Sequence, residues 1–271
     1  MNLFIEIYLK LTISLYNNSA NTKFIGKSIH FLPSCHSTNE VASALIRSEK
    51  AVNGLTVITN DQTAGKGQHG NTWYSSANLN LTFSVIFFPK ALLVADSFLL
   101  NIISSLAVAD TLESFLDNDK NVCVKWPNDV YIEHKKASGI LIETTIRGNS
   151  IHSIVIGIGL NVNQEIFQIP TATSLFIENE KNQDLQAVFD ILLEQLEYYY
   201  ELLSSQSKSV LFELYKKRLF GLNEENSFKD QEEVFKGFIR DVEENGCLII
   251  EKESGIRKAY HFKEVQFEIK N

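Results

Sequence analysis

The chain has 271 residues, 44% of them hydrophobic, and a formal net charge of −8. This length allows one large domain or a large domain with a small appendage, and the apolar content is enough for a substantial core. The acidic balance argues against a nonspecific DNA-binding protein, which needs a strong basic excess. The three cysteines, Cys35, Cys123 and Cys247, are too widely spaced to indicate a zinc site or a disulfide framework, so a reducing cytoplasm is the simplest setting.

Residues 1–23 are interpreted as an N-terminal extension of uncertain structure. The segment begins with an apolar stretch, but Glu6 and Lys10 interrupt it and no small-residue cleavage site follows clearly, which disfavours a signal peptide. No apolar run in the chain is expected to reach the length of a membrane-spanning helix.

Residues 24–220 predict helices and strands that do not alternate regularly. Helical spacing or capping is seen at 37–50, 97–116, 184–203 and 209–220, and β-branched or alternating segments are seen at 54–60, 80–89, 122–134, 137–146 and 153–163. Ser37 and Asp96 are expected to cap the first two of these helices. We therefore predict an α+β body with a mixed, largely antiparallel sheet flanked by helices.

Residues 221–271 show a different pattern. Short alternating segments at 233–243, 246–254 and 257–269 predict a small all-β domain, which we expect to be a compact barrel.

The segment DQTAGKGQHGNTW, residues 61–73, combines three glycines with a lysine and a tryptophan. Glycine lets backbone amides approach an anion, Lys66 adds a charge, and Trp73 offers a flat face to a ring such as adenine. A phosphate-binding loop of the Walker A type is excluded because Gly67 and Gln68, rather than Ser or Thr, follow Lys66, and because Asn60 stands where that motif has its first glycine. A surface loop anchored by Trp73 is the structural alternative.

The segment KWPNDVYIEHKKASG, residues 125–139, places an amide and a carboxylate, Asn128 and Asp129, just after a lysine. Such a group could bind ATP phosphates and a magnesium ion. An ordinary Pro-Asn-Asp turn is the alternative, with Lys135 and Lys136 as solvated surface charges.

Two further segments are weaker signals. GIGLNVN, residues 157–163, has glycines that would let a ligand lie against a strand, and Asn161 could donate to a phosphate or ribose; a buried strand leading into a turn is the simpler interpretation. The STN triplet at Ser37 could be no more than a helix cap.

Taken in order, STN, QTAGKGQHGxxW, KWPNDVYxxxKKxxGILIE and GIGLNVN resemble the biotin–protein ligase family over residues 24–165. The resemblance implies a class II synthetase-like catalytic domain that joins biotin and ATP into biotinyl-5′-AMP, with Mg²⁺, and then transfers biotin to one lysine of a biotin carboxyl carrier domain. It also implies a monomer or a homodimer formed through sheet edges. Such an enzyme accelerates the reaction by positioning the reactants and by neutralising the charge of the phosphates.

The resemblance also implies individual roles. Lys136 and Lys66 are the expected catalytic cations. The expected biotin-binding residues are Ser37, Thr38, Asn39, Gln62, Gly65, Lys66, Gly67, Lys136 and Gly139. The expected ATP- and adenylate-binding residues are Gln68, Trp73, Lys125, Asn128, Asp129 and Asn161, with Asp129 also as the magnesium ligand.

The glycine loop departs from the GRGRxG form that is common in this family. Lys66 keeps the charge of the first arginine without its forked geometry, and Gln68 replaces the second, so we predict an active site that releases its adenylate more readily. Family members that also repress transcription carry an N-terminal helix-turn-helix domain of some sixty residues. Because STN begins at Ser37, too few residues precede it for such a domain, and we expect no DNA binding. We also expect no membrane association.

Two alternatives remain open on sequence grounds. A lipoate–protein ligase would share the architecture, although KWPND followed by KKASG favours biotin. The second alternative is a non-catalytic domain that binds biotin or nucleotide, and the replacement of an arginine by Gln68 is the only feature that keeps it open. An acceptor domain is excluded because it needs a Met-Lys-Met sequence and the one methionine is Met1.

Overall fold

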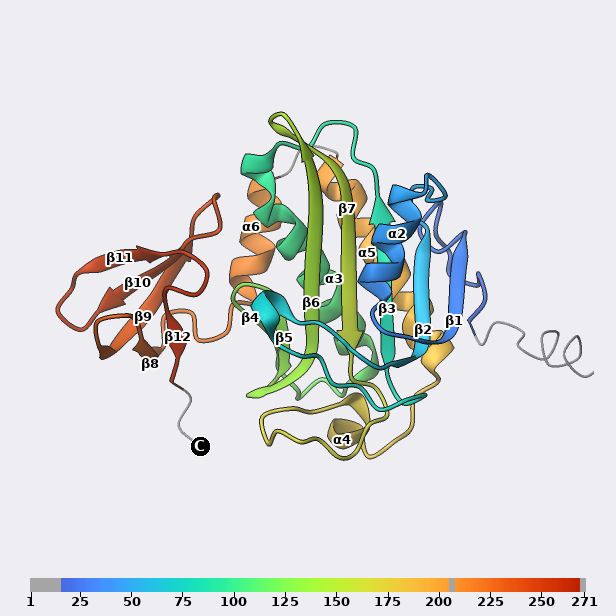
Figure 1. The fold of residues 1–271 in the computed structure, drawn as a ribbon. Coiled ribbons are helices and arrows are strands. Elements are labelled where there is room, and N and C mark those ends of the chain that lie inside the picture. Colours follow the sequence, from blue (N-terminus) through green and yellow to red (C-terminus); the bar gives the residue numbers. More distant parts are fainter. Residues whose placement is uncertain (1–15, 205–207, 269–271) are drawn as a thin grey trace, which may run out of the picture.

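A computed structural model describes residues 16–204 and 208–268. It contains a seven-stranded sheet, helices on both of its faces, and a separate five-stranded sheet at the C-terminus (Figure 1). The strands of the large sheet are β1 (Ile29–Cys35), β2 (Thr56–Gln62), β3 (Leu81–Phe87), β4 (Val122–Lys125), β5 (Asp129–Ile132), β6 (Lys135–Arg147) and β7 (Ser150–Leu160). The helices are α2 (Thr38–Arg47), α3 (Phe98–Phe115), α4 (Leu175–Asn179), α5 (Leu185–Ser204) and α6 (Lys208–Lys217), with 3-10 turns at Gln68–Gly70 and Val94–Asp96.

The large sheet has the order β1-β2-β3-β7-β6-β5-β4. Only the β1–β2 pair is parallel among these pairings, which confirms the predicted mixed, largely antiparallel sheet. Strand β1 was not predicted from the sequence. It is a partly exposed edge strand that contains Pro33, and an edge is where a strand tolerates proline.

Side-chain alternation gives the large sheet two different faces. On β3 and β7, Phe83, Val85, Ile156 and Ile158 belong to the main core, which α3, α5 and α6 complete. The residues between them on the strands point to the opposite face, where α2 packs (Figure 1). Because α2 covers only part of that face, the sheet surface beside it is left for a cavity.

Helix α3 is the most deeply enclosed helix of the body. The 94–115 stretch has the length and apolar composition of a membrane span, so the expectation that no run would reach that length was wrong. Most of the stretch is buried inside the fold, however, as expected for the core helix of a large sheet domain.

The predicted helix caps are only partly realised. Ser37 stands at the N-cap of α2, but its side chain makes no capping hydrogen bond. Asp96 does not cap α3: the N-cap residue is Ser97, and the Asp96 carboxylate pairs instead with Lys208 Nζ at 2.6 Å. A long-range ion pair thus replaces the local cap.

The chain before β1 packs on the body from Tyr16 onward; residues 1–15 of the predicted extension lie outside the described residues. Tyr16 is fully buried against Phe189 of α5. The buried Glu197 carboxylate of α5 accepts hydrogen bonds from the backbone N–H groups of Phe24 and Ile25, both at 2.9 Å, and from that of Lys23. This carboxylate therefore fastens the incoming segment to α5.

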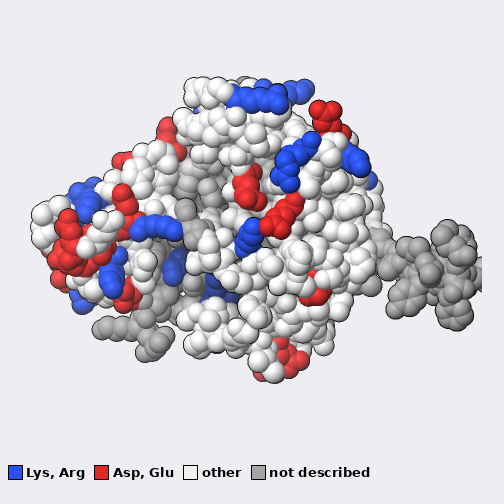
Figure 2. Space-filling view, viewed as in Figure 1, with Lys and Arg blue, Asp and Glu red and all other residues white. Residues whose placement is uncertain are grey.

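The C-terminal sheet contains β8 (Glu225–Lys229), β9 (Val234–Val242), β10 (Leu248–Lys252), β11 (Arg257–Tyr260) and β12 (Gln266–Phe267). Its order is β11-β10-β9-β8-β12 and all pairings are antiparallel, which confirms the predicted β-rich C-terminal region. No pairing among residues 221–268 joins β11 to β12, so the sheet stays open and closure into a barrel is not seen. Figure 2 shows charged side chains of both signs crowded over this sheet, at the left of the view.

Candidate active site

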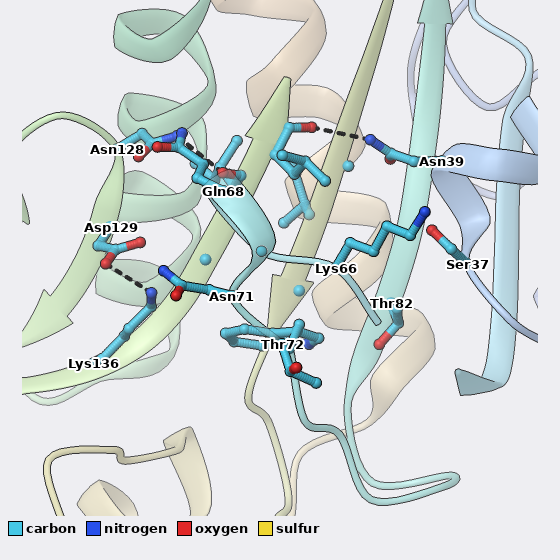
Figure 3. A pocket seen from close by; sticks show the side chains of 18 of the residues that line it. Ser37, Asn39, Lys66, Gln68, Asn71, Thr72, Thr82, Asn128, Asp129 and Lys136 are labelled. Carbon is cyan, nitrogen blue, oxygen red and sulfur yellow. Dashed lines mark hydrogen bonds and ion pairs between the residues drawn. The ribbon is translucent and has the colours of Figure 1, made fainter. Parts of the chain in front are cut away.

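A cavity of about 200 Å³, partly open to solvent, lies on the sheet face that α2 leaves uncovered. Figure 3 shows the side chains that surround it. Its lining includes thirteen of the predicted site residues: Ser37, Thr38, Asn39, Gln62, Lys66, Gly67, Gln68, Trp73, Lys125, Asn128, Asp129, Lys136 and Gly139. The four separate motifs of the sequence thus converge on one place.

The start of α2 forms one wall through a buried hydrogen-bond network. The Thr38 backbone N–H donates to Gln62 Oε1 at 2.9 Å, and Ser84 Oγ lies 2.7 Å from Thr38 Oγ1 and 2.6 Å from Asn39 Oδ1. Asn39 Nδ2 donates to Glu143 Oε2 at 2.8 Å. These bonds fix polar groups at the cavity wall.

Glycines on β6 and β7 form the floor. A Cβ atom on Gly139 would come within 2.9 Å of Trp73 Cζ3, and one on Gly159 would overlap the same indole. A Cβ on Gly157 would overlap the Asn39 amide. The Trp73 ring therefore rests on the floor, and its buried Nε1 has no hydrogen-bond partner among the described residues.

The glycine loop closes over the cavity as a small hairpin. The Gly67 N–H donates to Asn71 O at 2.7 Å, and the Trp73 N–H donates to Gly65 O at 2.9 Å. Lys66 pairs with Glu40 of α2, and this hydrogen bond and ion pair lower the pKa of Glu40 and raise the pKa of Lys66. The loop lysine is thus held at the α2 side of the cavity.

The KWPND turn, which connects β4 to β5, forms the opposite wall. Lys136 Nζ pairs with Asp129 Oδ2 at 2.7 Å and lies 5.9 Å from the centre of the Trp73 ring. Asn128 Nδ2 donates to Ile140 O at 2.9 Å. Burial lowers the pKa of Lys125, against the raising effect of Asp129. Figure 3 shows Lys136 and Lys66 at opposite sides of the cavity.

Two predicted site residues do not line the cavity. Gly65 lies just behind it, where a Cβ atom would overlap the Trp73 carbonyl oxygen. Asn161 is buried below the end of β7 and its Nδ2 donates to Thr173 O at 2.9 Å, although its Oδ1 has no partner among the described residues. Their contacts with a ligand stay predictions.

Gly157 and Gly159 line the cavity, as the interpretation of GIGLNVN as a ligand-contacting strand requires, whereas several other lining residues were not assigned a role from the sequence: Asn71, Thr72, Thr82, Phe83, Trp126, Pro127, Ile140, Leu141, Ile158 and Phe262. The period of two along β3 would have placed Thr82 and Ser84 on one face. Nothing local could have placed Phe262 here, because it comes from the C-terminal region.

No group of three or more His, Cys, Asp or Glu side chains that could hold a metal is found in residues 16–204 and 208–268. In the cavity, one carboxylate, Asp129, stands among Lys66, Lys125 and Lys136. This excess of positive charge suits a ligand that carries phosphate or carboxylate groups.

Comparison with known proteins agrees with this geometry. Residues 31–161 match the model of the Biotin/lipoate A/B protein ligase family. The Bifunctional ligase/repressor BirA of Bacillus subtilis is 27% identical over 256 residues, which cover 93% of this chain and 78% of BirA. The Biotin--[acetyl-CoA-carboxylase] ligase of Mycobacterium tuberculosis is 32% identical over 163 residues, 59% of each chain.

Among solved structures, the biotin protein ligase from Aquifex aeolicus in complex with biotin and ATP superimposes with a TM-score of 0.72. It is 26% identical in sequence, and the match covers 89% of this chain and 99% of that one. Residues 31–161 of the chain therefore form a domain of the biotin/lipoate A/B protein ligase family.

Proposed function

We propose that the chain is a biotin–protein ligase. The observation that carries the proposal is the convergence of the STN, glycine-loop and KWPND motifs on one cavity, in a fold that matches a ligase described with biotin and ATP. In the first step a biotin carboxylate oxygen attacks the α-phosphorus of ATP, the bond to the β-phosphate breaks, and pyrophosphate leaves. In the second step a lysine amine attacks the biotinyl carbonyl carbon, AMP leaves, and the amine loses a proton.

The biotin side of the cavity is assigned to the α2 wall and the glycine floor. Ser37, Thr38, Asn39 and Gln62 supply fixed polar groups there, which suit a ring that both donates and accepts hydrogen bonds. Gly139 lets a ring approach the backbone, and the loop residues Gly65, Lys66 and Gly67 close over it.

The nucleotide side is assigned to the KWPND turn and the end of the glycine loop. Lys125, Asn128 and Asp129 face the phosphates, Trp73 and Gln68 adjoin the adenosine, and Asn161 supports the nucleotide from below. Lys136 lies between the two sides, where its cation can stabilise the charge that develops as the acyl phosphate forms.

The residues present suit a magnesium ion that arrives on the ATP phosphates. Mg²⁺ commonly uses one or two carboxylates together with substrate phosphates, and Asp129 is a carboxylate suitably placed for this. The ion would neutralise phosphate charge; Asp129 would exchange its present partner, Lys136, for it.

The acceptor is proposed to be a biotin carboxyl carrier domain of a carboxylase. The name of the Mycobacterium tuberculosis relative, a biotin--[acetyl-CoA-carboxylase] ligase, supports this class of partner.

Pyrophosphate release by the purified chain with Mg-ATP tests the proposal, with biotin, lipoate or neither added. Release that depends on biotin supports it. Release that depends on lipoate would assign the chain to the lipoate branch of the family, and release with neither ligand by the folded chain would overturn the proposal, as would no release at all.

A further inference from the structure

Lys125 is held between two aromatic rings at the wall of the cavity. Its Nζ lies 4.9 Å from the centre of the Phe267 ring and 5.3 Å from that of Tyr131. Tyr131 is a neighbour on the β4–β5 hairpin, whereas Phe267 comes from β12 of the C-terminal sheet. The last strand of the chain thus reaches an ammonium group of the candidate nucleotide site.

The position of the Phe267 ring is fixed by the C-terminal sheet. Phe267 pairs with Phe228 across the β8–β12 ladder, and their ring centres lie 5.1 Å apart. Its ring also packs at 5.9 Å from that of Phe220, which precedes the sheet. A ring fixed on two sides can orient a flexible lysine rather than follow it.

The residue after Lys125 is also tied to the C-terminal region. Trp126 Nε1 donates to Gly246 O at 2.9 Å, and its ring lies 5.8 Å from that of Phe262, another residue of the cavity lining. Two successive residues of the KWPND turn therefore contact the C-terminal region, Lys125 at strand β12 and Trp126 at the loops before β10 and after β11.

Carboxylates do not hold Lys125 in place. The nearest acidic group of the turn, Asp129, pairs with Lys136, and no salt bridge within 4 Å reaches Lys125 from residues 16–204 or 208–268. The cation is buried enough for an aromatic face to matter, since a cation over a ring gains more when water is displaced.

We propose that Phe267 is a positioning residue for nucleotide binding: its ring keeps the Lys125 ammonium directed at the cavity, so the C-terminal sheet sets the affinity for ATP. The inference rests on the proposed function for the identity of the nucleotide. It assigns to Phe267 no contact with substrate.

The variant Phe267→Leu tests the proposal because it keeps an apolar side chain and removes the ring. We expect the Kd and KM for ATP to rise about three- to fivefold, the size that a partly buried cation–π contact would give, while the KM for biotin stays unchanged. Phe267→Tyr keeps the ring and should bind ATP like the unsubstituted chain.

Phe235→Leu is the matched control. Phe235 lies in the same sheet with its ring centre 4.2 Å from Lys252 Nζ, away from the cavity lining. It should leave the Kd for ATP unchanged, and thermal unfolding of each variant shows whether the fold is kept.

A double-mutant cycle separates positioning from general damage to the fold. In a Lys125→Met background, Phe267→Leu should change the Kd for ATP by less than about 1.5-fold, because the ring would then have no cation to orient. An equal loss in both backgrounds, or an equal loss in Phe235→Leu, would overturn the proposal.

ATP binding is measured by calorimetry alongside pyrophosphate release, so the two hypotheses fail differently. An unsubstituted chain that binds ATP without biotin-dependent pyrophosphate release would refute the proposed function and still report on Phe267. A chain that releases pyrophosphate with no effect of Phe267→Leu would refute the inference alone.

Discussion

At the scale of single residues, the cavity holds its two expected catalytic cations apart and pairs each with a carboxylate. Lys136 pairs with Asp129 on the KWPND side, and Lys66 pairs with Glu40 on the α2 side. The first pair is half-buried and the second is exposed, and ion pairs that water reaches are weak, so a bound phosphate or carboxylate can draw either lysine away from its partner. Both lysines are thus placed to bind an anionic ligand.

Replacing Lys136 by alanine should reduce biotin-dependent pyrophosphate release about a hundredfold while the fold is kept, because a preorganised charge at the reacting phosphate is lost. Lys135→Ala is the control, since Lys135 is the exposed neighbour of Lys136 on β6. Normal release by Lys136→Ala would refute the assigned role.

Gln68 lines the cavity where the common form of the loop has an arginine. Gln68→Arg should retain biotinyl-5′-AMP better and so reduce biotin labelling of bystander lysines, because a forked cation can bind the adenylate phosphate at two points. Asn149→Arg adds the same charge in the β6–β7 turn and should not change the labelling. Equal labelling by the Gln68→Arg and unsubstituted enzymes would show that this substitution does not control retention.

At the scale of elements, the sequence predicted those helices and strands whose local pattern of apolar residues is clear. Strands β3 and β7 follow from their short β-branched and apolar sequences, helix α3 follows from its long apolar run, and helix α5 follows from its apolar spacing. Strand β1 was missed because it is half-buried and contains a proline, and α4 is too short to give a periodic signal.

The site shows the same division. The motif residues could be identified because they are neighbours in the sequence. The residues that orient their side chains come from distant segments and could not be identified. Ser84 and Glu143 orient Asn39 from two other strands, and that arrangement exists only after the sheet has paired. Glu40 appears in the sequence as an ordinary acidic residue of a first helical turn, and only the fold brings it to Lys66.

Glu197 of α5 gives a prediction at this scale. Glu197→Gln should lower the free energy of unfolding by about 1–3 kcal/mol, because an amide cannot accept all the backbone N–H groups that the buried carboxylate accepts. Thermal or urea unfolding measures the effect. Glu201→Gln, one turn later, removes only an exposed pair with Lys23 and should lower the free energy of unfolding much less than Glu197→Gln does; equal effects of the two variants would contradict the anchoring role.

At the scale of the whole molecule, the C-terminal sheet is part of the site rather than an appendage. Trp126 and Lys125 contact it directly, Phe262 enters the cavity lining, and Tyr215 OH of α6 donates to Pro127 O at 2.8 Å. The boundary predicted at residue 221 separates two sheets, yet the KWPND turn is supported from both sides of it.

Trp126→Phe tests this connection. It removes the indole N–H that bonds Gly246 O and should lower the free energy of unfolding by about 1 kcal/mol, the typical net value of such a bond. Hydrogen exchange should rise at the amides around β10 more than at those of β3. Unchanged unfolding and exchange would show that the bond does not stabilise the contact between the sheets.

The resting place of Trp73 on the glycine floor also gives the protein a built-in optical probe. The chain has two tryptophans, and both line the cavity, but Trp126 is buried with its N–H bonded whereas the Trp73 ring lies on the glycine floor. A ligand that takes the floor must move the indole or cover it, and either event changes the surroundings that set its emission. In the Trp126→Phe variant, Trp73 would be the sole tryptophan, and stopped-flow emission excited selectively at the indole could time the closing of the loop separately from the chemical step without any attached label.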